Sequence, residues 1–178
     1  MMKILIVGFL FLSTFSMAQE NIDKTNYLNS YGINKDSIQE LVFKNKERFN
    51  SFVSTFEEKE GFRLQFLIFD ESGNLIKHKL DKHIKECGKG DVEKLRKKYH
   101  KKLPSIIELN SHFTTTLNKP EINNFTVIFV WMQEQELDTE TKHVFELYHQ
   151  HAFETYHIWK ENNNIEFYFL DMNYKSEE

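Results

Sequence analysis

The sequence has almost no cysteine, because Cys87 is the only one among its 178 residues. A single thiol cannot form an intrachain disulfide, so the fold has to depend on an apolar core. The sequence also has only two prolines and six glycines, and it therefore offers no linker of the kind that marks a domain boundary. Seventeen phenylalanines supply ample material for the core.

Catalytic and cofactor-binding motifs are missing as well. The chain holds no Gly-x-Ser-x-Gly sequence, which marks one large class of hydrolases. Gly88 and Gly90 are too few and wrongly spaced for a phosphate-binding loop. Neighbouring lysines would activate the Cys87 thiol, whereas Glu86 acts in the opposite direction, and we interpret this residue as a turn cysteine. We therefore predict no catalytic residue and no cofactor.

The amino terminus has the three regions of a secretory signal peptide. Lys3 gives a positive start, residues 4–12 form an uninterrupted apolar run, and Ser16 and Ala18 supply small residues at the end. A membrane-spanning helix needs about 20 apolar residues, so this run is too short for an anchor. We predict cleavage after Ala18, export to the periplasm or the medium, and no transmembrane segment in the cleaved protein.

The charge is mildly acidic overall and unevenly distributed. The formal net charge is -4, which argues against a nucleic-acid-binding protein. Residues 77–102 are nevertheless strongly basic, and residues 131–178 are strongly acidic. We interpret both segments as solvated surfaces. The alternative is that the basic segment 77–102 binds a protein or an anionic surface of the cell envelope.

Hydrophobic periodicity predicts one small α/β domain over residues 35–178, preceded by the signal peptide at 1–18 and a flexible leader at 19–34. A capping box of Ser37 with Glu40 is expected to begin the first helix. The predicted helices cover residues 37–60, 91–103 and 138–161, with a short helix near 106–113. The predicted strands cover 62–69, 75–80, 125–132 and 165–170.

Residues 125–170 predict a strand, a helix and a parallel strand. The apolar run at 125–132 is continuous, as a central strand buried on both faces requires. In the helix, the spacing predicts that Thr155 and Ile158 lie on the apolar face. Phe153 is expected on the polar face, where it would mark a contact with another element or a partner.

The eight histidines of the chain raise the question of a metal site. His143 with Glu146, and His151 with Glu154, lie three residues apart, so each pair shares one side of the predicted helix. These four residues are the candidate metal ligands. A catalytic zinc ion takes three protein ligands, however, and the sequence shows no third ligand beside either pair. We otherwise interpret the histidines, His149 among them, as surface residues. The exception is His151, which falls on the apolar face with Thr155 and is interpreted as a core histidine with its hydrogen bonds satisfied.

The strand that ends in Trp131, the helix rich in aromatic residues and the strand that ends in Asp171 form a recognisable unit. Over residues 125–175 this unit resembles the opening βαβ unit of thioredoxin-like proteins. The resemblance implies a redox cysteine pair after the tryptophan, but residues 132–138 contain no cysteine. Thiol–disulfide exchange through such a pair is therefore excluded, because the nucleophilic sulfur is missing.

The order of the predicted elements extends this comparison to the whole domain. A thioredoxin-like domain runs strand, helix, strand, helix, strand, strand, helix, and moving the last three predicted elements of this chain to the front gives that order. The resemblance thus implies a circularly permuted thioredoxin-like arrangement. We expect a small mixed sheet of about four strands with helices on both faces, in which strand 125–132 is interior and pairs with 62–69 or 165–170.

These observations favour a non-catalytic, exported accessory or binding domain over an enzyme. A first alternative is a metal-binding or hydrolytic enzyme that uses histidines brought together by the fold. A second alternative is a charge-mediated interaction module of the cell envelope.

Overall fold

The computed structural model describes residues 24–60, 66–76, 98–132, 149–150 and 152–173. The chain divides into two compact units, Met1–Ile38 and Gln39–Glu178. Among the described residues, no helix combines the length and the apolar character that crossing a membrane requires.

In the first unit, residues 24–30 form a helix, at a place where we predict a flexible leader. The rings of Tyr27 and Tyr31 meet edge to face at the end of this helix, with centroids 5.3 Å apart, and Leu28 is buried. The 3-10 helix η1 (Lys35–Ser37) ends this unit.

The predicted capping box of Ser37 with Glu40 is wrong. The side chain of Asn34 caps η1 by accepting a hydrogen bond from the amide of Asp36. The Ser37 hydroxyl donates to the carbonyl of Asn34, at 2.7 Å, instead of capping a following helix. Glu40 lies in strand β1 (Glu40–Leu41).

Helix α2 (Lys46–Glu60) therefore begins nine residues later than predicted. Its first turn is stabilised by Asn45, whose side-chain oxygen accepts from the amide of Arg48 at 2.9 Å. The preceding residues are extended because buried Leu41 and Phe43 alternate with Val42, which is exposed.

A four-stranded sheet with the order β1-β4-β3-β2 forms the centre of the second unit. Strand β3 (Phe125–Trp131) pairs in parallel with β4 (Ile165–Asp171) and antiparallel with β2 (Phe66–Phe69). Strand β1 pairs in parallel with β4. The predicted α/β class and the interior position of strand 125–132 are confirmed, and every residue of β3 is buried.

The hairpin that follows β2 is confirmed over residues 66–76, where the amide of Ile76 donates to the carbonyl of Ile68 at 2.8 Å. Its predicted continuation over 77–80 lies outside the described residues. Tyr99 forms a bridge with Ile76, so the predicted helix over 91–103 is wrong at its carboxyl end.

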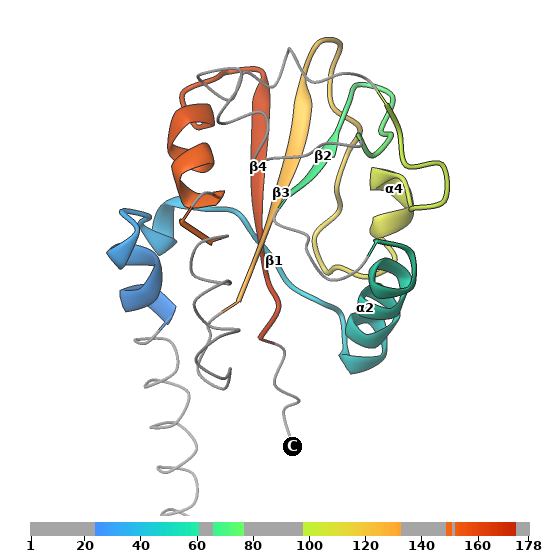
Figure 1. Ribbon diagram of the computed structural model, residues 1–178, viewed down its shortest axis with the longest axis horizontal. Helices are drawn as coiled ribbons and strands as arrows, with labels where there is room; N and C mark the ends of the chain where they lie inside the picture. The colour runs from blue at the N-terminus through green and yellow to red at the C-terminus, as the bar shows by residue number, and fades with distance from the viewer. Residues whose placement is uncertain (1–23, 61–65, 77–97, 133–148, 151, 174–178) are drawn as a thin grey trace, which may run out of the picture. The chain divides into compact units, whose positions relative to one another are not determined.

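Helices cover both faces of this sheet (Figure 1). Helix α2 and the short helix α4 (Ile106–Leu109) lie on one face, where Phe52 and Leu109 share a buried cluster with Ile128. The helical residues 149–150 and 152–159, called here the C-terminal helix, lie on the other face. Aromatic rings of this helix meet rings of the sheet there. Phe129 meets Phe153 at 4.9 Å, Phe169 meets Tyr156 at 5.0 Å, and Phe66 meets Trp159 at 5.8 Å.

Two predictions about the buried side of the C-terminal helix are wrong. Phe153, expected on the polar face, is buried against the sheet, and Ile158, expected in the core, is 46% exposed. The face that meets the sheet carries His149, Phe153 and Tyr156, which recur at the spacing of a helical stripe. Thr155 is buried, as predicted.

Candidate binding surface

Three parallel strands direct their carboxyl ends to the same edge of the sheet, because β1, β4 and β3 run in one direction (Figure 1). Val42, Met132 and Met172 are the first residues after these strands. In open α/β sheets, ligands bind preferentially outside the carboxyl ends of the strands. The residues at this edge are therefore the first place to look for a site.

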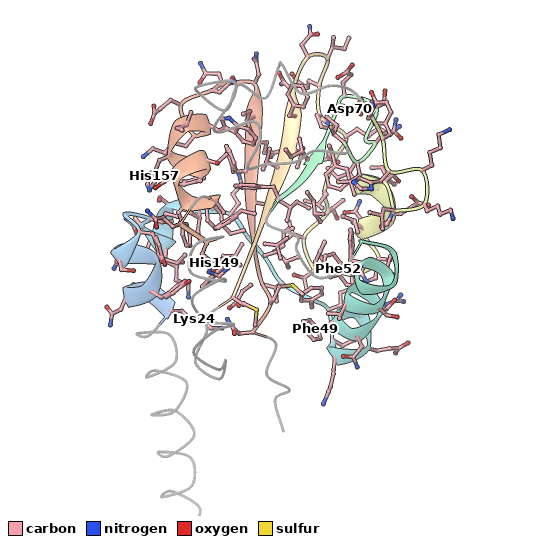
Figure 2. The ribbon with its side chains drawn as sticks, viewed as in Figure 1. Lys24, Phe49, Phe52, Asp70, His149 and His157 are labelled. Atoms are coloured by element: carbon pink, nitrogen blue, oxygen red, sulfur yellow. The ribbon has the colours of Figure 1, made fainter. Side chains whose placement is uncertain are left out.

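Several apolar side chains that pack against the core of this unit are only partly buried, and one of them, Met132, follows β3 directly. Phe49 and Val53 of α2, together with Met132, are partly buried and pack against the cluster beneath α2. The ring of Phe49 meets that of Phe43 edge to face, with centroids 5.2 Å apart, and Figure 2 locates Phe49 on α2. We call Phe49, Val53 and Met132 the carboxyl-edge surface.

A backbone hydrogen bond joins the ends of β3 and β4, and side-chain hydrogen bonds fix the residues that follow β4. The amide of Met172 donates to the carbonyl of Trp131 at 2.8 Å. The Asp171 carboxylate accepts from the backbone and side-chain nitrogens of Asn173 at 2.8 and 2.9 Å. A fixed edge with a flexible methionine is suited to bury an apolar group of variable shape.

A buried polar group lies at the opposite end of the sheet, in the turn after β2 (Figure 2). Asp70 is only 1% exposed, and its Oδ1 accepts from the amides of Ser72 and Asn74 at 3.0 and 3.1 Å. Its Oδ2 accepts from the hydroxyl of Tyr99 at 2.7 Å. This hydrogen bond, with burial and the nearby acidic charges, raises the pKa of Tyr99 to about 12.

The three hydrogen bonds to Asp70 tie its own turn and the segment at Tyr99 to one carboxylate, which is a structural use of the group. From sequence we predict a turn here, but not the burial of the aspartate. The available signal was an aspartate at the start of a turn that contains glycine, a position where the side chain commonly accepts from the amide two residues later.

His149 is a buried histidine of the C-terminal helix (Figure 2). The prediction that it is a surface residue is wrong, because its side chain is 3% exposed and its ring lies 5.9 Å from that of Phe153. Burial lowers the pKa of His149 to about 4. The imidazole is therefore neutral over the ordinary pH range.

His112 is also buried. Its Nδ1 lies 3.0 Å from the carbonyl oxygen of Arg48, and since a carbonyl can only accept, Nδ1 must carry the hydrogen. The ring thereby ties α2 to the segment after α4.

Only one of the four predicted metal ligands, Glu154, belongs to the described part of the chain. Glu154 is exposed and accepts a hydrogen bond from the Gln150 side chain at 3.1 Å, whereas His143, Glu146 and His151 lie outside the described residues. Among the residues that are described, no three His, Cys, Asp or Glu side chains are placed to hold a metal ion.

Cys87 and most of the basic segment 77–102 also lie outside the described residues. Of that segment, Lys98, Lys101 and Lys102 are described and exposed, which agrees with a solvated surface.

Comparison of the chain with protein-family models, with curated proteins and with solved structures found no match.

Proposed function

We propose that this protein is an exported, non-catalytic binding domain and that the carboxyl-edge surface is where it binds. The observation that carries this proposal is the part exposure of Phe49, Val53 and Met132 against a buried core. Met132 directly follows β3, one of three strands that run parallel to one another. Burying apolar area contributes about 25 cal/mol per Å², so an apolar group of a partner can be held here without any reactive side chain.

The roles of the buried ionisable groups support a non-catalytic function. Asp70 is occupied by two backbone amides and the hydroxyl of Tyr99. His149 packs against Phe153 in its neutral form. Both groups contribute to the fold. The thioredoxin-like resemblance implies reactive cysteines in the stretch after Trp131, but that stretch begins with Met132 and contains no cysteine.

We further propose that the fold is a circularly permuted thioredoxin-like arrangement. The pairing supports this idea, because 125–131 and 165–171 form a parallel pair and the antiparallel hairpin 66–76 continues the sheet from 125–131. An experimental structure in which residues 91–97 form the remaining helix of that order would agree with the proposal, and an extended strand there would contradict it.

The binding proposal is tested with a neutral apolar probe, hexanol, and variants that keep the side-chain shape. Val53→Thr and Met132→Gln each replace an apolar group with a polar one, and each is expected to weaken hexanol binding about fivefold, since a buried methylene contributes about 0.8 kcal/mol.

The matched control for the hexanol titration is Ile107→Thr, because Ile107 is an exposed apolar residue of α4 at 46% exposure. This variant is expected to bind hexanol with unchanged affinity. Equal affinities of all three variants and the parent protein, measured by calorimetric titration, would overturn the assignment of the surface.

Export is tested separately, on the full-length chain expressed in a bacterium. Fractionation and intact-mass measurement are expected to find the protein outside the cytoplasm with Gln19 as its first residue. A cytoplasmic protein that retains Met1 would contradict the export part of the proposal and leave the binding part unaffected.

A further inference from the structure

We draw no further inference here: the strongest candidate, the exposed side chain of Ile122 on the turn at the amino ends of β3 and β4, is a single apolar residue, and nothing in the structure shows what covers it.

Discussion

Replacing Asp70 should reveal whether this buried carboxylate is structural. In Asp70→Ala, the amides of Ser72 and Asn74 lose their acceptor. A hydrogen bond to a charged group contributes about 1.5–3 kcal/mol. Since Ser72 and Asn74 are themselves exposed, water replaces part of this loss, and we expect the free energy of unfolding to fall by about 3 kcal/mol. That is a large share of the about 5–15 kcal/mol that stabilises a typical domain.

Two further variants separate the contributions to this site. Asp70→Asn keeps an acceptor for the two backbone amides and loses the charge, so we expect a loss of about 1–2 kcal/mol. Tyr99→Phe removes only the third hydrogen bond, whose phenol is part-exposed, and should cost less than about 1 kcal/mol.

Urea unfolding followed by circular dichroism gives these free energies, provided that the slope of the free energy of unfolding against urea concentration is the same in all variants. If Asp70→Ala lowers the free energy of unfolding by less than about 1 kcal/mol, the carboxylate does not stabilise the turn, and a chemical role for Asp70 would be favoured instead.

Three other perturbations follow from the same structure. Gly73→Ala should lower the free energy of unfolding, measured with urea, by about 2–4 kcal/mol. Gly73 has a φ of +76°, and an added Cβ would lie 3.0 Å from a buried side chain of α4. The control is Ser72→Ala, whose free energy of unfolding is expected to stay within about 0.5 kcal/mol of that of the parent protein. His149 has its pKa lowered from 6.5 to about 4, so the unfolded chain takes up a proton first as the pH falls, and stability should decrease by about 3 kcal/mol between pH 6.5 and pH 4. His149→Leu should flatten that part of the profile, and an unchanged slope would refute this assignment. Asn110→Ala removes two hydrogen bonds to the backbone of Leu117, at 2.6 and 2.8 Å, and should lower the melting temperature by an amount equivalent to about 2 kcal/mol. Asn110→Asp keeps the acceptor, so its melting temperature should fall by less. Equal decreases in the two variants would contradict the role of Asn110 as both donor and acceptor.

The central strands of the sheet could be predicted from sequence because their burial leaves a local signal. A strand covered by helices on both faces is a near-continuous apolar run. Residues 125–131 are apolar except for Thr126, and all seven are buried. Strand 165–171 follows the helix at the distance of a parallel connection. Because connections between parallel strands are short and right-handed, few strand orders remained possible for these elements.

The start of α2 could not be predicted because its competing signal is long-range. Leu41 and Val42 fit a helical period with Ile38, yet Leu41 pairs with Leu170 in β4, more than a hundred residues away. A strand of two residues gains its stability from that pairing, which no local periodicity reports.

The buried side of the C-terminal helix was misassigned for a different reason. Aromatic residues occur on several sides of this helix, so periodicity alone does not choose which side meets the sheet. The buried side is determined by packing against the sheet, where Phe153 contacts Phe129 and Tyr156 contacts Phe169.

The candidate surface was not recognised from sequence, because Phe49 and Val53 have the spacing of ordinary core residues. Their part exposure depends on how α2 packs against the buried cluster, which is a property of the fold as a whole.

The most direct test of the account is a map of backbone amide chemical shifts during a hexanol titration of the folded protein. Saturable shifts that concentrate at Phe49, Val53 and Met132 are the predicted result. Shifts that concentrate around Asp70 or on the exposed side of the C-terminal helix, or no saturable shift at any concentration that preserves the fold, would contradict binding at the carboxyl ends of the parallel strands.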